Sequence, residues 1–191
     1  PKKFQDPKVT LNGSMRATVA LGELKTLWIN TGTLCNLTCK NCYIESSPRN
    51  DRLVYISSSE VAVYLDEIVT LGLSTEEVGF TGGEPFMNPD IIKMIEDALL
   101  RGYRVMVLTN AMRPMRRHEV ALVDLKNRFG SDLILRVSLD HYTKKLHETE
   151  RGTHSWNKTI DGIKWLAENG FHINVAGRTQ WGETEDSIRE G

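Results

Sequence analysis

Short apolar runs rich in β-branched residues alternate with amphipathic stretches from Thr26 onward. In one such stretch Val61, Leu65 and Ile68 recur at helical spacing, which predicts a single buried helix face. The pattern predicts strands at Thr26–Thr31, Glu77–Thr81, Arg104–Asn110, Leu133–Asp140 and Phe171–Ala176. It predicts helices at Ser58–Leu71, Pro89–Arg101, Met115–Phe129 and Trp156–Asn169. Such alternation indicates a parallel sheet with right-handed crossovers.

The two faces of the predicted strands differ in polarity. The strand Leu133–Asp140 places apolar side chains on one face and Arg136, Ser138 and Asp140 on the other. A parallel strand covered by helices on both sides would be apolar on both faces. A face that turns polar toward the C-terminal end is typical of a barrel whose lumen opens into a site. An open doubly wound sheet also fits the alternation of strands and helices, but the polarity of the strand faces favours an α/β fold with a partial (β/α) barrel.

The length of 191 residues suits one domain with a full core. Residues 1–25 lack clear periodicity, so we expect an N-terminal extension before a core domain of residues 26–191. Residues 183–191 resemble the opening turn of a crossover helix with no strand after it. We therefore expect the chain to be truncated after the fifth strand, with an incomplete core domain.

The formal net charge is −1, with 26% charged residues. A protein with near-neutral net charge has no overall electrostatic attraction to nucleic acid or to a membrane surface, so the charge does not support binding to either. The sequence shows no secretory or transmembrane run, which favours a cytoplasmic location. His141 and His147 are expected at the surface rather than in catalysis.

The three cysteines of the chain, Cys35, Cys39 and Cys42, fall within eight residues. An odd count at tight spacing disfavours disulfides and indicates a metal site. A structural zinc site and a cubic iron–sulfur cluster each normally take four protein ligands, so three leave one position open. A zinc site would need a histidine, but none lies at a finger-like offset: His118, His141, His147, His154, His172.

A second motif, Gly82-Gly83-Glu84-Pro85, ends the second predicted strand. Paired glycines allow close backbone approach to a ligand, and Glu84 presents a carboxylate where barrel active sites lie. Alone, the motif is equally typical of a tight strand-to-helix connection.

Together these motifs, with Arg-Val-Ser-Leu-Asp on the fourth strand, resemble the radical S-adenosylmethionine (radical SAM) superfamily. The nearest branch holds the molybdopterin-precursor cyclases and the SPASM-type maturases. The resemblance implies a 4Fe–4S cluster on Cys35, Cys39 and Cys42, with S-adenosylmethionine on the fourth iron. It implies an enzyme that forms a 5′-deoxyadenosyl radical, which takes hydrogen from an unidentified substrate such as a peptide or cofactor precursor. It also implies a small-molecule or peptide substrate and an external reductant such as flavodoxin or ferredoxin.

The resemblance also suggests contacts for S-adenosylmethionine. The Gly82–Glu84 segment would receive the methionine ammonium, and Pro85 would stiffen the turn that follows. Ser138 and Asp140 would bond ribose hydroxyls or the methionine moiety, unless they are a solvated strand end.

Further candidates lie at other strand ends and beside the cysteines. Asn110 and its neighbour Thr109 would line substrate or adenine, with structural capping as the alternative. Arg178 would meet the methionine carboxylate or an anionic substrate. The position before the third cysteine is often aromatic in the family but is Asn41 here, so Asn41 and Tyr43 would meet adenine.

Two departures bear on the substrate. Where the cyclases carry a substrate-binding arginine, this chain has Gly79, and no cysteines remain for a second cluster. The alternative function is a non-catalytic iron–sulfur or zinc-binding module for electron transfer or structure. Such a module would not need the Gly82–Glu84 segment or the Ser138 and Asp140 pair.

Overall fold

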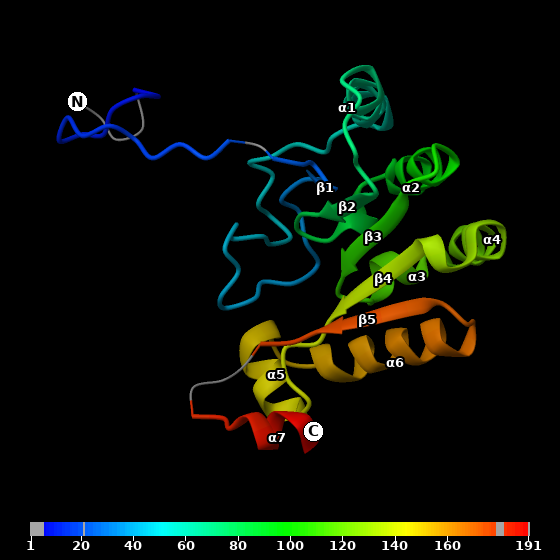
Figure 1. The fold of residues 1–191 in the computed structure, drawn as a ribbon. Helices are drawn as coiled ribbons and strands as arrows, with labels where there is room; N and C mark the ends of the chain where they lie inside the picture. Colours follow the sequence, from blue (N-terminus) through cyan, green and yellow to red (C-terminus); the bar gives the residue numbers. More distant parts are fainter. Residues whose placement is uncertain (1–5, 21, 179–181, 191) are drawn as a thin grey trace.

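The computed structural model describes residues 6–20, 22–178 and 182–190. Within them, five parallel strands form one sheet, shown in Figure 1, in the order β1-β2-β3-β4-β5. A doubly wound sheet reverses its strand order partway across, whereas this order follows the sequence throughout. The strands are β1 (Thr26–Asn30), β2 (Glu77–Thr81), β3 (Arg104–Thr109), β4 (Leu133–Ser138) and β5 (His172–Ala176).

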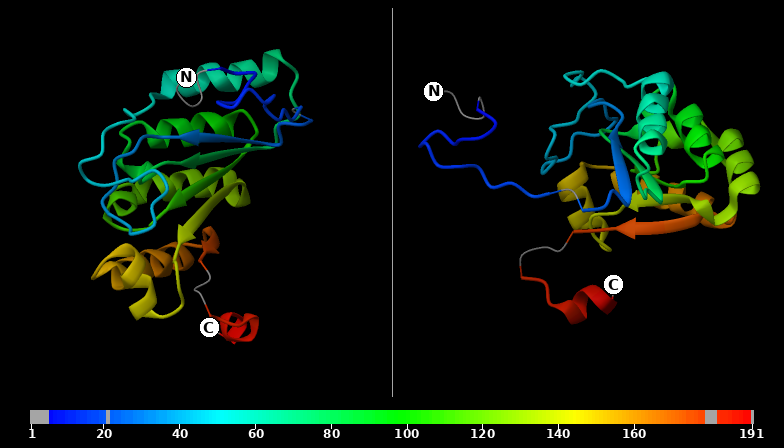
Figure 2. Two further views of the ribbon diagram at one scale, coloured as in Figure 1. Left: turned by 90° about the vertical axis from the view of Figure 1, so that its left-hand side faces the viewer. Right: turned by 45° about the horizontal axis from the view of Figure 1, so that its top comes forward.

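Helices cover one face of the sheet. Between the strands run α1 (Ser58–Thr70), α2 (Ile91–Leu100), α4 (Glu119–Phe129) and α6 (Ser155–Glu168), and they lie on the same side of the sheet in Figures 1 and 2. The core between sheet and helices includes the fully buried Leu65, Phe80, Ile95 and Leu135. One-sided cover and sequential strand order confirm the predicted partial (β/α) barrel.

The first helix begins where the sequence predicts. The Ser57 hydroxyl accepts a hydrogen bond from the Glu60 backbone N–H at 3.3 Å, and the Glu60 carboxylate accepts one from the Ser57 N–H at 2.8 Å. This capping box satisfies two backbone donors at the helix start and fixes where α1 leaves the loop.

Three features differ from the expected elements. The segment predicted as one helix, Met115–Phe129, is divided between α3 (Arg113–Arg116) and α4. The two helices are separated by Arg117, which caps the C-terminal end of α3, and by His118, which precedes α4. The helix α5 (Lys144–Arg151) was not predicted. Two short 3₁₀ turns, η1 (Pro85–Met87) and η2 (Gly130–Asp132), precede α2 and β4. The helix α7 (Glu185–Glu190) lies within residues 183–191, where the sequence predicts the opening turn of a helix.

Two long segments lie outside the layered core. Residues 6–20 extend away from the sheet in Figure 1, with one antiparallel bridge between Val9 and Met15. Residues 31–57, which carry the cysteines, connect β1 to α1 beside the C-terminal ends of the strands. Among the described residues, no helix is both long and apolar enough to cross a membrane. The proposed boundary between an extension and a core domain stays a prediction.

Candidate functional site

The cysteine-bearing segment is held in place by backbone contacts at its base. The Cys35 N–H donates to the Ser47 carbonyl oxygen at 3.1 Å, within an isolated parallel bridge between Leu34 and Ser47. The Thr33 hydroxyl donates to the Asn50 carbonyl oxygen at 2.9 Å. Because both ends of the loop are pinned to each other, the three cysteines stay on one turn.

Two of the cysteine sulfurs accept hydrogen bonds from the backbone. The Leu37 N–H donates to Cys35 Sγ at 3.4 Å, and the Ser46 N–H donates to Cys42 Sγ at 3.2 Å. Burial raises the pKa of Cys35 to about 12 and also raises the pKa of Cys39. A bound metal reverses this effect, because its positive charge deprotonates a coordinating thiol.

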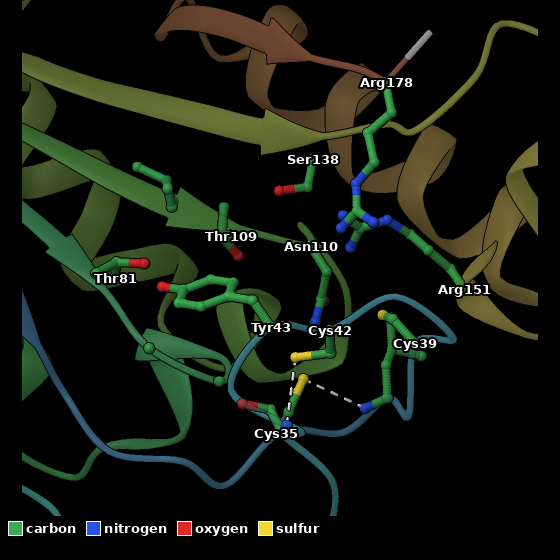
Figure 3. Close-up of a pocket in the computed structure, with 15 residues that line it drawn as sticks. Cys35, Cys39, Cys42, Tyr43, Thr81, Thr109, Asn110, Ser138, Arg151 and Arg178 are labelled. Carbon is green, nitrogen blue, oxygen red and sulfur yellow. Dashed lines mark hydrogen bonds between the residues drawn. The ribbon is translucent and has the colours of Figure 1, made fainter. Parts of the chain in front are cut away.

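The cysteines line a cavity of about 220 Å³ at the C-terminal ends of the strands, drawn in Figure 3. Several sequence-predicted residues meet there from distant parts of the chain. The lining consists of Cys35, Leu37, Cys39, Cys42, Tyr43, Ser46, Thr81, Gly82, Gly83, Leu108, Thr109, Asn110, Ser138, Arg151 and Arg178. The predicted residues Asn41, Glu84, Pro85 and Asp140 are outside this lining.

The paired glycines contact the residues just before the first cysteine. The Gly83 N–H donates to the Gly32 carbonyl oxygen at 2.8 Å, and the Glu84 N–H donates to that of Leu34 at 3.0 Å. A Cβ at position 83 would lie 2.2 Å from the Leu34 carbonyl oxygen. Gly82 has a φ of +141°, which side chains rarely allow, and a Cβ there would lie 2.7 Å from the Gly32 oxygen. The glycines are therefore required for the close contact between β2 and the cysteine loop.

Glu84 is 2% exposed, and its carboxylate contacts the protein itself. It accepts hydrogen bonds from the Thr109 hydroxyl at 2.8 Å, the Asn110 N–H at 2.8 Å and the Phe86 N–H at 3.3 Å. Burial raises the pKa of Glu84 to about 7, although these three donors act in the opposite direction. The carboxylate thus joins the ends of β2 and β3, and Pro85 is buried at the start of η1.

Asp140 has a different contact from the one predicted. Because β4 ends at Ser138, the strand alternation does not continue to Asp140, and only Ser138 lines the cavity. The buried Asp140 carboxylate accepts from Arg151 Nε at 2.8 Å and pairs with Arg178 Nε at 3.3 Å. Both arginines line the cavity (Figure 3), so this carboxylate holds two cations at its wall.

The cysteine loop is also held by α5 and by Arg178, at the β5 edge of the sheet. The Asn41 amide donates to a Glu150 carboxylate oxygen at 2.7 Å, and Arg178 donates to the Asn41 carbonyl oxygen at 3.3 Å. The Lys40 N–H donates to the Glu150 carbonyl oxygen at 2.8 Å. Asn41 therefore connects the loop to α5 and to Arg178, two residues after β5. Tyr43 is 82% exposed at the cavity edge.

Sequence reasoning missed Arg151 and Asn36. Arg151 lies at the end of helix α5, which was not predicted. The only sequence feature that could have indicated it was an arginine, later in the chain than Asp140, to which no role had been given. Asn36 accepts a hydrogen bond from the Asn110 amide at 2.8 Å, so it joins the cysteine loop to β3.

The two histidines expected at the surface are buried. His141 accepts from the Thr143 N–H at its Nδ1 atom, 2.8 Å away, and its Nε2 contacts Glu183. His147 is fully buried against Trp156, and neither of its ring nitrogens has a hydrogen-bond partner in the described part of the chain. Burial, and next the nearby Arg151, lowers the pKa of His147.

The three thiols fit a cluster in the chemistry of their surroundings. They are free, they line one cavity, and two receive N–H donors of the kind that tune cluster sulfurs. Within residues 6–20, 22–178 and 182–190, no three His, Cys, Asp or Glu side chains converge closely enough to hold a single metal ion. A cluster does not need this convergence, because each cysteine binds a different iron.

Comparison with curated proteins identifies relatives. The family model described as the radical SAM superfamily matches residues 29–190. The chain is 32% identical over 143 residues to the subtilosin biosynthesis protein AlbA of Bacillus subtilis, covering 74% of this chain and 30% of that protein. It is 27% identical over 139 residues to the mycofactocin maturase MftC of Mycobacterium tuberculosis, covering 72% and 33%. It is 32% identical over 149 residues to GTP 3′,8-cyclase 1 of the same species, covering 72% and 38%. The chain thus spans about a third of the length of these relatives.

Solved structures share the fold. SuiB of Streptococcus suis, bound to the precursor peptide SuiA, gives a TM-score of 0.66 at 19% identity, covering 88% of this chain and 35% of that one. Methylornithine synthase PylB gives 0.59 at 17% identity, covering 78% and 43%. At these identities the likeness establishes the partial barrel alone.

Proposed function

Because the chain belongs to the radical SAM superfamily, we propose that it is the cofactor-binding core of an enzyme that cleaves S-adenosylmethionine reductively. One observation carries this proposal: three free cysteines, a glycine pair and two arginines from different segments line one cavity. When bound, a reduced 4Fe–4S cluster supplies an electron to S-adenosylmethionine, whose C5′–S bond breaks to give a 5′-deoxyadenosyl radical.

The loop residues would hold the cluster. Cys35, Cys39 and Cys42 would each bind one iron as a thiolate. The N–H groups of Leu37 and Ser46 would stabilise negative charge on two of the sulfurs, as charge-assisted donors do. The contacts at Ser47 and Glu150 would keep the loop from opening into solvent.

The other cavity residues would hold S-adenosylmethionine. Backbone carbonyls of the Gly82–Gly83 turn, which lines the cavity, would accept from the methionine ammonium. Arg178, and Arg151 beside it, would meet the methionine carboxylate, and Ser138 and Asn110 would bond polar groups of the nucleoside. Tyr43, at the cavity edge, and Asn41, beside Cys42 but outside the lining, remain the candidates for adenine.

Glu84 and Asp140 would act mainly through their neighbours. The Glu84 carboxylate orients Thr109 and the Asn110 backbone at the end of β3. The Asp140 carboxylate orients the two arginines. Both are thus positioning residues, with Pro85 holding the turn that follows Glu84.

We infer a peptide or cofactor-precursor substrate. AlbA is named for bacteriocin biosynthesis, MftC is a maturase, and SuiB was solved with a precursor peptide. An external reductant such as flavodoxin or ferredoxin would supply the electron. Free thiols in the site suit the reducing cytoplasm.

Anaerobic reconstitution of the chain with iron and sulfide tests the proposal. After reduction with dithionite, addition of S-adenosylmethionine should change the electron paramagnetic resonance spectrum and yield 5′-deoxyadenosine. A Cys39→Ala variant should hold less iron and give no product, while an Arg117→Gln variant, exposed between α3 and α4, should match the unmodified chain. A stable cluster whose electron paramagnetic resonance spectrum does not change when S-adenosylmethionine is added would overturn the proposal and favour an electron-transfer module.

A further inference from the structure

The face of the sheet opposite the helices continues directly from the cavity. Thr81, Leu108 and Ser138 line the cavity and lie on this face at the C-terminal ends of their strands. Two residues back along each strand, the same face presents Gly79, Met106 and Arg136. These three positions therefore adjoin the cavity-lining residues on the open face of the sheet.

Trp28 forms a flat apolar surface on this face. It pairs with Gly79 across β1 and β2, and a Cβ at Gly79 would lie 2.3 Å from Trp28 Cε3. The indole ring thus lies directly over the glycine, in space that another residue would fill. The ring is nonetheless 45% exposed, and its N–H has no hydrogen-bond partner in the part of the chain that the structure describes.

Arg136 provides a cation on the same face. It pairs with Leu108 of β3 and Asn174 of β5, and it is exposed. Among residues 6–20, 22–178 and 182–190, neither the Arg136 guanidinium nor the Asn174 amide makes a hydrogen bond or ion pair within the protein. A guanidinium beside an amide is a suitable site for a carboxylate, which it binds bidentately.

The spacing of these two features sets the size of the ligand. Trp28 on β1 and Arg136 on β4 are three inter-strand spacings of about 4.8 Å apart, and the register places Arg136 two residues, about 6.6 Å, further along the strands, so the two positions are roughly 16 Å apart. An extended chain advances about 3.3 Å per residue, so about five residues span this distance. Between them lie the half-buried apolar side chains of Met106 and Leu108.

We propose that this face binds a peptide substrate, whose acidic residue pairs with Arg136 and whose aromatic or aliphatic side chain, about five residues away, lies on Trp28. The inference rests on the proposed function and names the substrate class of the same site. One guanidinium suits one carboxylate, whereas a nucleoside triphosphate would need several cations. The intervening apolar surface likewise suits peptide side chains.

A defined hexapeptide library tests the inference without any turnover. The reconstituted chain is immobilised, equilibrated anaerobically with the library in the presence of S-adenosylmethionine, and the bound peptides are quantified by mass spectrometry. The unmodified chain should enrich peptides that carry Glu or Asp about five positions from an aromatic or aliphatic residue. Their Gln or Asn counterparts should be retained up to about fivefold less, as expected for one exposed ion pair.

Three variants separate the two contacts. Arg136→Gln should lose the acidic preference and keep the apolar one. Gly79→Ala should displace the Trp28 ring and lose the apolar preference while it keeps the acidic one. Arg117→Gln, which removes an exposed arginine elsewhere, should leave both preferences unchanged. Circular dichroism confirms that each variant is folded.

The outcomes distinguish this inference from the proposed function. Equal retention of acidic and amide peptides, or no enrichment at all, overturns the inference even if 5′-deoxyadenosine forms. An Arg136→Gln variant that keeps the acidic preference overturns it as well. Peptide enrichment without any cleavage of S-adenosylmethionine would support the binding face and count against the proposed chemistry.

Discussion

Replacing Asp140 by asparagine removes the carboxylate that Arg151 and Arg178 share. Asp140 and Arg151 have side chains that are 3% and 11% exposed, so this pair is screened little by water. Arg178 is 42% exposed and adds little, because exposed pairs contribute at most about 1 kcal/mol. The main effect of Asp140→Asn is a buried Arg151 without its counter-charge.

The expected loss follows from that burial. Removing one partner of a buried ion pair costs about 3 kcal/mol in the free energy of unfolding. A matched control is Asp66→Asn, since Asp66 also pairs with an arginine, Arg101, but is 67% exposed. That control should cost less than about 1 kcal/mol.

Urea unfolding of the metal-free chain measures both losses from the transition midpoint at constant slope. A double-mutant cycle with Arg151→Gln should give a coupling energy of about 2 kcal/mol for the Asp140–Arg151 pair. If Asp140→Asn costs no more than Asp66→Asn, or if the coupling energy is near zero, the carboxylate does not hold the arginines and the reasoning fails.

Two other substitutions probe the β2 turn. Gly83→Ala places a methyl group against the Leu34 carbonyl oxygen, so we expect a folded chain that incorporates less iron. The control is Gly22→Ala, whose Cβ would meet nothing within 4 Å, and equal iron content in the two variants would contradict the close contact. The folded-state pKa of Glu84, about 7, lies above its ordinary value of 4.5. The neutral carboxyl therefore stabilises the fold fully below pH 4.5, and this contribution is lost as the pH rises through about 7. Between about pH 5 and 8 the free energy of unfolding of the metal-free chain should therefore fall by up to about 3 kcal/mol more than that of Glu84→Gln, and parallel pH profiles would refute this.

The apolar pattern was sufficient to predict the layered part of the fold. Strands such as Glu77–Thr81 and helices such as Ser58–Thr70 bury one regular set of apolar residues, so their periodicity is present in the sequence. The helix Lys144–Arg151 has only Leu146 as an apolar residue, and it buries His147 and Glu150 instead. Its stability depends on partners from other segments, which no local pattern reveals.

The candidate site was predictable to a similar degree. Motif spacing brought the cysteines, the glycine pair and Ser138 to one cavity. The contacts of Glu84 and Asp140 were not predictable, because their partners, Thr109 and Arg151, lie in other elements. A carboxylate that faces a ligand and one that faces its own protein look alike in sequence.

The sequential strand order has a consequence for how the chain is made. Domains fold from their N-terminal end as they leave the ribosome, so β1 and the cysteine loop emerge before every other strand. The contacts that close the loop come from Glu150 and Arg178, more than a hundred residues later in synthesis. We therefore expect the nascent loop to stay accessible to iron delivery until α5 and β5 emerge, which makes completion of the sheet the step that seals the metal site.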